Sequence, residues 1–195
     1  MISRRQLLVA GGALAVTAVS TPARAALPAP QPAGDDEGYL QFAAVATLVT
    51  RVFYREAAKV AGVDEGARRR LARLRVKEAA LRTRLTAPLG SDPPTLADFA
   101  VVLPATATKT LASAAAFGID LHELRGAVLL SGAAYAEDSS TRLLLARVAS
   151  HDAQAISVLR ALTGRPGDTG LLVPVDLEQA SDRLDALLQI KEIIG

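Results

Sequence analysis

The chain has 195 residues, of which 50% are hydrophobic, 4% aromatic and 22% charged, and it contains no cysteine. This composition excludes a disordered chain, and the lack of cysteine excludes disulfides, thiolate zinc sites and a cysteine nucleophile. The scarcity of aromatic residues argues against an aromatic sugar or nucleic-acid groove and against an aromatic-rich β-sandwich. Alanine, leucine, valine and arginine dominate, which is typical of one all-helical domain.

Residues 1–25 have the features of a signal peptide for export. The pair Arg4-Arg5 precedes an apolar stretch over 7–19, and residues 23–25 show the small-x-small pattern that a signal peptidase cleaves. The arginine pair favours the twin-arginine route across the cytoplasmic membrane, to a periplasmic or extracellular location. A general secretory signal or an uncleaved anchor is the alternative.

Removal of residues 1–25 changes the charge of the chain. It takes three arginines from the 22 basic residues and nothing from the 20 acidic ones, which leaves 170 residues and a net charge of −1. Residues 26–36 are rich in proline and alanine and are expected to form an extended linker. We expect one helical domain over 37–195.

Apolar residues recur at helical spacing along this domain, and turn residues separate the runs. No segment has a strand pattern, and Asp120 with Glu123 forms a candidate capping box. We therefore expect an all-α fold, an up-down four-helix bundle with extra short helices and a C-terminal helix. The expected helices cover 37–61, 64–87, 120–136, 140–162 and 176–194, with two short ones over 95–117.

Acidic residues interrupt the apolar lines of two helices. Glu78 lies between Leu74 and Leu81, and Asp152 follows Val148 by one turn. A carboxylate inside a bundle costs several kcal/mol unless it is paired, protonated or bound to a metal. One interpretation is a buried polar pair satisfied by a hydroxyl, by water or by an arginine such as Arg51 or Arg82. The other is a metal site.

The segment 37–194 resembles exported bacterial ferritin-like domain proteins, the group that includes desiccation-related proteins. The resemblance lies in the pair Phe53-Tyr54, the run 132–135 (GAAY), the segment 148–160 and the closing helix after Pro174. It implies a ferritin-like bundle, whose members hold two metal ions with Glu and Glu-x-x-His ligands on facing helices.

The metal ligands that the resemblance implies are mostly absent from this chain. The two Glu-x-x-His motifs fall on Glu78 with Leu81 and on Asp152 with Ala155. Two acids without an adjacent histidine provide too little charge and too few ligands for two cations. A ferroxidase centre of the usual kind is therefore expected to be lost. The remaining carboxylate positions fall on Thr47, Thr50 and near Val128.

Three further side chains are weaker candidates for this chemistry. Glu56 falls near the apolar line of the first helix. His151 neighbours Asp152 in sequence but points about 100° away from it, which favours a satisfied histidine at the core boundary over a ligand. His122, placed in the first turn of its expected helix, is expected at the surface.

The second expected helix is strongly basic. Eight arginines and lysines and only one acid lie between Arg68 and Arg84. This indicates either a solvated face or a surface for an anionic envelope polymer or lipid, with Arg69, Arg73 and Arg84 as candidate contacts. No nucleic acid is expected, because no aromatic side chains are interleaved.

The sequence thus favours an exported, non-catalytic ferritin-like bundle with a binding or stress-associated role in the cell envelope. No catalytic residue and no cofactor are expected. The alternative is a metal-dependent oxidase or iron-binding protein that holds iron or manganese with Glu56, Glu78, Asp152 and His151. A homo-oligomer is left open.

Overall fold

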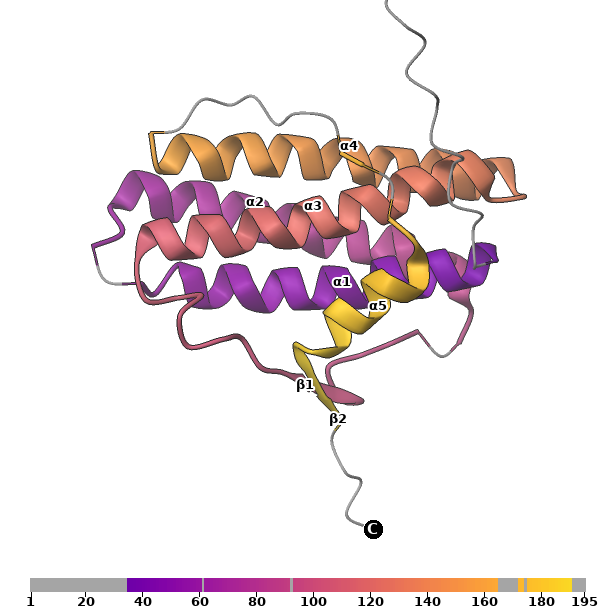
Figure 1. Ribbon diagram of the computed structural model, residues 1–195, viewed down its shortest axis with the longest axis horizontal. Coiled ribbons are helices and arrows are strands. Elements are labelled where there is room, and N and C mark those ends of the chain that lie inside the picture. The colour runs from indigo at the N-terminus through magenta and orange to yellow at the C-terminus, as the bar shows by residue number, and fades with distance from the viewer. Residues whose placement is uncertain (1–34, 61, 92, 165–171, 174, 191–195) are drawn as a thin grey trace, which may run out of the picture.

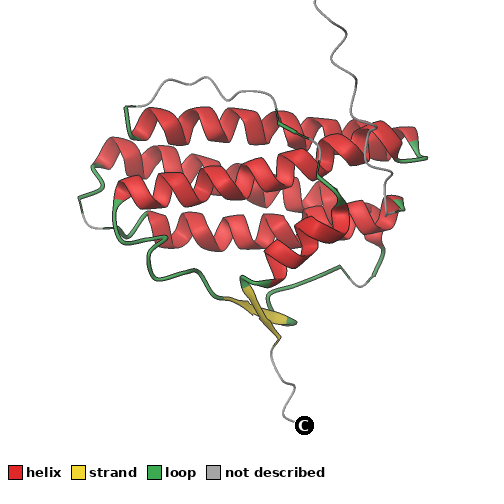
Figure 2. Cartoon of the chain, viewed as in Figure 1, coloured by secondary structure: helices red, strands yellow, loops and turns green. Residues whose placement is uncertain are grey.

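Four long helices lie side by side in the computed structural model of the protein (Figure 1). The structure describes residues 35–60, 62–91, 93–164, 172–173 and 175–190, so the expected signal over 1–25 and most of the linker lie outside it. Within this part the chain is all-helical apart from two three-residue strands (Figure 2). The elements are α1 (Asp36–Ala57), α2 (Glu65–Thr86), the short 3-10 helix η1 (Ala87–Leu89), β1 (Phe99–Val101), α3 (Leu111–Tyr135), α4 (Ser139–Leu162), α5 (Leu177–Asp185) and β2 (Leu188–Ile190).

Aspartates cap the beginnings of four helices. Asp35 accepts a hydrogen bond from the Gly38 backbone N–H, and Asp64 accepts one from that of Ala67, before α1 and α2 respectively. Each carboxylate satisfies a backbone donor that the first turn leaves free and lies at the positive end of the helix. Asp138 and Asp176 do the same for α4 and α5. The expected beginnings of these helices are therefore correct to within about two residues.

The four long helices do not simply alternate in direction. Gly132 on α3 lies against Tyr39 and Leu145, at the beginnings of α1 and α4, and Gly118 lies against Phe53 and Leu159, near their ends. Hence α3 runs antiparallel to both α1 and α4. The connection over 87–110 is long enough for α2 to run parallel to α3, as the direction of the colours in Figure 1 also shows. Consecutive helices are antiparallel in the pairs α1–α2 and α3–α4, and the parallel pair α2–α3 departs from the expected up-down alternation.

Close packing of the helices depends on the glycines of α3. A Cβ atom on Gly118 would lie 2.6 Å from the Phe53 ring, and one on Gly132 would lie 2.7 Å from Leu145. Real Cβ atoms essentially never make contacts this short, so a larger residue at either position would displace its neighbours on α1 or α4.

The region between α2 and α3 differs from the sequence prediction. Helix α3 begins at Leu111, because Thr110 and Ser113 form a reciprocal capping box, so Asp120 lies inside the helix instead of capping it. The two short helices expected over 95–117 are wrong, since this stretch contains β1 and the first turns of α3.

The C-terminal part also differs. The last helix ends at Asp185, not at Ile194, because residues 188–190 pair with β1 in an antiparallel ribbon in which Phe99 is opposite Ile190 and Val101 opposite Leu188. A three-residue strand leaves too short an alternation to be recognised in a sequence.

The core follows the expected apolar lines. Phe42, Val49 and Phe53 of α1 are buried, as are the expected leucines Leu71, Leu74 and Leu85 of α2. Tyr135, the last residue of α3, is 41% exposed. None of the helices in the described segments is both long and apolar enough to cross a membrane.

Candidate functional site

One polar side chain from each of the four long helices meets in the centre of the bundle. They are Thr47 of α1, Glu78 of α2, Arg125 of α3 and Asp152 of α4, and none is more than 1% exposed. Charged side chains are rarely buried this completely unless they are paired. These four residues, together with the two histidines and the tyrosine described below, are called the central network.

Arg125 binds Glu78 through two parallel hydrogen bonds. Its Nη1 and Nη2 atoms donate to Oε2 and Oε1 of Glu78 at 2.7 and 2.9 Å. The planar guanidinium matches the two carboxylate oxygens, which makes this the strongest geometry available to an ion pair of side chains.

The same guanidinium also binds Asp152 and Thr47. Its Nη2 and Nε atoms donate to Oδ1 of Asp152 at 2.5 and 3.0 Å, and Nη1 donates to the Thr47 hydroxyl at 3.0 Å. Thr47 in turn donates to the backbone carbonyl of Ala43 at 2.7 Å. Gly126, next to Arg125, permits this approach of α4, since a Cβ atom there would lie 3.3 Å from that of Asp152.

Two histidine side chains also form hydrogen bonds with the buried carboxylates. Nδ1 of His122 lies 2.7 Å from Oδ1 of Asp152, and Nε2 of His151 lies 3.0 Å from Oε1 of Glu78. Because an ionised carboxylate only accepts, both of these ring nitrogens carry hydrogen. The other nitrogen of His122 lies 2.5 Å from the hydroxyl of Tyr54, so the network extends from α4 to α1.

Burial and pairing shift the pKa values of the network in opposite ways. Burial alone raises the pKa of Glu78, but the charge of Arg125 and the hydrogen bonds from His151 and Arg125 lower it more, to well below the usual 4.5. Burial raises the pKa of Tyr54 well above 10.0, and the charge of Glu78 adds to this. Glu78 is therefore ionised and Tyr54 is neutral at physiological pH.

The structure confirms that Glu78 and Asp152 are buried together and bridged by an arginine, but the arginine is Arg125. Arg82 donates instead to the backbone carbonyl of Pro94, and Arg51 has no bond to either acid. Arg125 is not among the site residues predicted from the sequence. Its spacing of four residues from Leu121 and three from Val128 is the signal that could have revealed it.

His122 is fully buried, so the expectation of a surface position is wrong. The cause is the earlier beginning of α3: His122 lies in the middle of the helix, one turn before Arg125. His151 is 8% exposed and bonded to Glu78, in line with a satisfied histidine at the core boundary.

The remaining predicted positions lie apart from the charged centre. Glu56 is partly exposed and pairs with Arg55 and Lys59 at 2.7 and 2.8 Å, outside the core. Thr50 is buried and donates to the carbonyl of Ala46. The third helix places Arg125, and not Val128, opposite the two acids.

Three residues of the network form a potential metal-binding group. One ligand atom from each of Glu78, His122 and Asp152 lies within 4.8 Å of the others. The guanidinium of Arg125, however, already binds both carboxylates. A divalent cation at this place would face a fixed positive charge at close range, which opposes its binding.

The three basic residues of α2 that the sequence offers as candidate contacts do not share one site. Arg69 lies 3.6 Å from Glu65, as a loose surface pair. Arg73 lines a groove between α2 and α4, which Arg84 does not reach.

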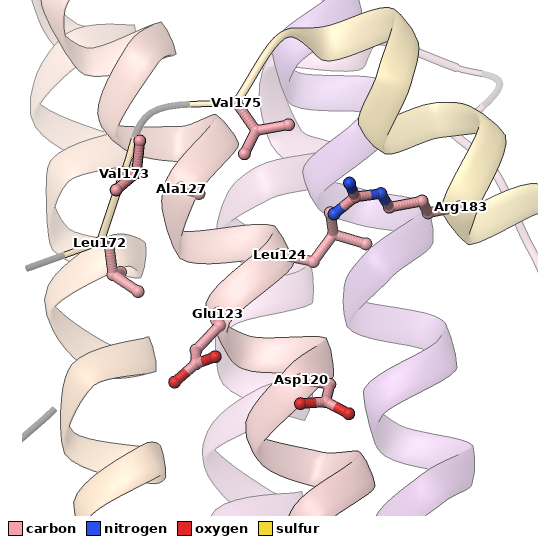
Figure 3. Close-up of a pocket in the computed structure, with 8 residues that line it drawn as sticks. All are labelled: Asp120, Glu123, Leu124, Ala127, Leu172, Val173, Val175 and Arg183. Carbon is pink, nitrogen blue, oxygen red and sulfur yellow. The ribbon is translucent and has the colours of Figure 1, made fainter. Parts of the chain in front are cut away.

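A pocket of about 420 Å³ lies beside α3 and α5 (Figure 3). Asp120 and Glu123 line it on α3, and Arg183 of α5 reaches across it toward Leu124. Glu123 also lies 3.5 Å from Arg160. Both acidic and basic side chains line the pocket, and Glu123 is already paired. The pocket therefore favours neither an anionic nor a cationic ligand.

The chain matches no family model, no curated protein and no solved structure. The chemistry of the central network and of the α2 surface is therefore the basis for assigning a function.

Proposed function

We propose that this chain is an exported, ferritin-like helical bundle that has replaced its metal centre with an internal arginine and acts by binding in the cell envelope. The observation that supports this most strongly is Arg125, fully buried between Glu78 and Asp152. The single long connection between α2 and α3 is also the topology of ferritin-like bundles.

The donor set supports a non-catalytic role. Both acids are occupied by Arg125, and the implied histidine positions hold Leu81 and Ala155. Thr47, at an implied carboxylate position, accepts from Arg125. The guanidinium supplies positive charge at the point where a di-metal protein would hold cations, so the carboxylates are neutralised without a metal.

Metal analysis of the purified full-length chain tests this proposal. After growth with added iron, manganese and zinc, we expect far less than one metal ion per chain. About two ions per chain would contradict the proposal. Glu56→Ala, which removes an acid outside the network, should contain as little metal as the unmodified chain.

The second candidate is a metal-dependent oxidase or iron-binding protein with an atypical site. The proximity of ligand atoms from Glu78, His122 and Asp152 favours it. It requires Arg125 to withdraw from both carboxylates. If it holds, the double variant Glu78→Ala/Asp152→Ala loses bound metal while Glu56→Ala retains it.

The proposed location in the envelope depends on residues 1–25. The variant Arg4→Lys/Arg5→Lys keeps the charge but removes the arginine pair, so the full-length protein should accumulate in the cytoplasm if the twin-arginine route is used. Unchanged export of this variant would indicate a general secretory signal. Cell fractionation distinguishes the two outcomes.

A further inference from the structure

Three unpaired cations follow one line of α2. Arg70, Arg73 and Lys77 are spaced three and four residues apart, which places them on the same side of the helix. All three are exposed, and none has an ion pair or a hydrogen bond within the part of the chain that the structure describes. Like charges at this spacing repel each other, so the row destabilises α2 unless something neutralises it.

The facing helix cannot supply the missing negative charge. In helix bundles, positions that flank a helix interface usually pair with opposite charges on the neighbour. The only acid of α4 is Asp152, which is buried in the central network. The residues of α4 that face the row are Ser157, Val158 and Ala161.

Helices α2 and α4 form the two sides of a groove that is lined by both cationic and apolar side chains. The groove has a volume of about 390 Å³, with the three cations at its edge and Leu74, Val158 and Ala161 on its apolar surface. A second hollow of about 220 Å³ shares Arg70 and Ala161 with the groove and adds Leu111 and Leu162. The apolar surface therefore continues past the cations toward the beginning of α2.

The second hollow contains one acid, Asp64. Its carboxylate accepts a hydrogen bond from the Ala67 backbone N–H at 2.7 Å, as the N-cap of α2. It is therefore engaged by the helix end and makes no ion pair with Arg70 within the described residues. Among the described residues, no acid neutralises the row of cations, which suits it to an external anion.

We propose that the α2–α4 groove binds an anionic lipid, with a phosphate head on Arg70, Arg73 and Lys77 and the aliphatic chain along Leu74, Val158 and Ala161. Arginine pairs bidentately with phosphate, and lysine adds a point charge. The apolar surface distinguishes a lipid from a purely ionic polymer, which would gain nothing from it. The inference rests on the proposed envelope-binding function and names the partner.

Dodecyl phosphate is a suitable soluble probe, titrated into the full-length chain by calorimetry. The variant Arg70→Gln/Arg73→Gln/Lys77→Gln should bind it at least tenfold more weakly, a loss of about 1.4 kcal/mol or more, because the phosphate head loses the three cations that hold it. The matched control Arg68→Gln/Arg75→Gln/Arg84→Gln removes the same charge from the same helix outside the groove, and should bind within about threefold of the unmodified chain.

A second variant separates binding from folding. Ala161→Glu places an acid on α4 opposite Arg70, at an exposed helical position. It should pair with the cations, raise the melting temperature and block dodecyl phosphate. A variant that binds less because it unfolds would instead melt at a lower temperature.

Three results would overturn the inference. Equal loss of binding in the two triple variants would show a diffuse charge effect of α2 and leave the envelope-binding function standing. Inorganic phosphate binding as tightly as dodecyl phosphate would show that the apolar surface plays no part. No binding of dodecyl phosphate by the unmodified chain would remove the site, while metal analysis tests the proposed function separately.

Discussion

Lys77 and Glu78 are neighbours on α2, but Glu78 lies in the paired, buried central network and Lys77 lies in the exposed α2–α4 groove. Glu78 points into the central network, where Arg125 and His151 satisfy its two oxygens. Lys77 lines the α2–α4 groove, where no acid of the facing helix is available. In the central network the guanidinium of Arg125 pairs with acids from two other helices. In the groove, three cations lie together with no ion-pair partner among the described residues.

This difference indicates what each set of charges does. An unpaired charge in the interior costs about 3–5 kcal/mol, so the complete network stabilises the bundle strongly. At the surface water solvates unpaired cations, so the row on α2 survives at a small cost in stability. The central network therefore maintains the fold, and the groove is free to bind a ligand.

The largest expected effect follows from breaking the interior. Arg125→Met leaves Glu78 and Asp152 as buried, uncompensated carboxylates, so the free energy of unfolding should fall by about 3–5 kcal/mol. Urea denaturation measures this. Arg160→Met is the matched control, because its partly exposed pair with Glu123 at 3.5 Å should contribute less than about 1 kcal/mol. Similar losses in both variants would contradict the distinction between the two regions.

A smaller, pH-dependent effect is expected for Glu78. The folded chain holds the pKa of Glu78 below its usual value of 4.5, so the unfolded chain takes up this proton first as the pH falls. The stability that ionised Glu78 contributes is present above about pH 4.5 and declines below it. The difference in stability between the unmodified chain and Glu78→Gln should therefore narrow between about pH 5 and pH 3. A constant difference over that range would contradict this assignment.

The smallest effect concerns the outer end of the network. Tyr54→Phe removes the hydroxyl that faces His122 and leaves a buried ring nitrogen without that partner, at a cost of about 1–3 kcal/mol. Tyr135→Phe is the control, since Tyr135 is 41% exposed and should change stability by less than about 0.5 kcal/mol. Thermal denaturation compares them, and an unaffected Tyr54→Phe would place this hydroxyl outside the network.

Some of this arrangement could be predicted from the sequence because local rules determine it. Acids that interrupt the apolar lines identified Glu78 and Asp152, and apolar periodicity with turn residues placed the beginnings of α1, α2, α4 and α5 to within about two residues. The surface position expected for His122 is wrong because α3 begins at residue 111, nine residues before the expected 120. Arg125 lies inside the helix in either case, and its acidic partners come from α2 and α4, which only the folded bundle brings to it. The row of cations was visible, but the neutral wall opposite them arises only when α2 and α4 pack together.

The central claim is that Arg125 provides the charge that metal ions provide in a ferritin-like bundle. The most direct test measures the melting temperature of the full-length chain and of Arg125→Glu with and without Mn²⁺. We expect Mn²⁺ to leave the melting temperature of the unmodified chain unchanged and to raise that of Arg125→Glu, in which an added carboxylate replaces the internal cation. A comparable rise in the unmodified chain, or no rise in the variant, would contradict it.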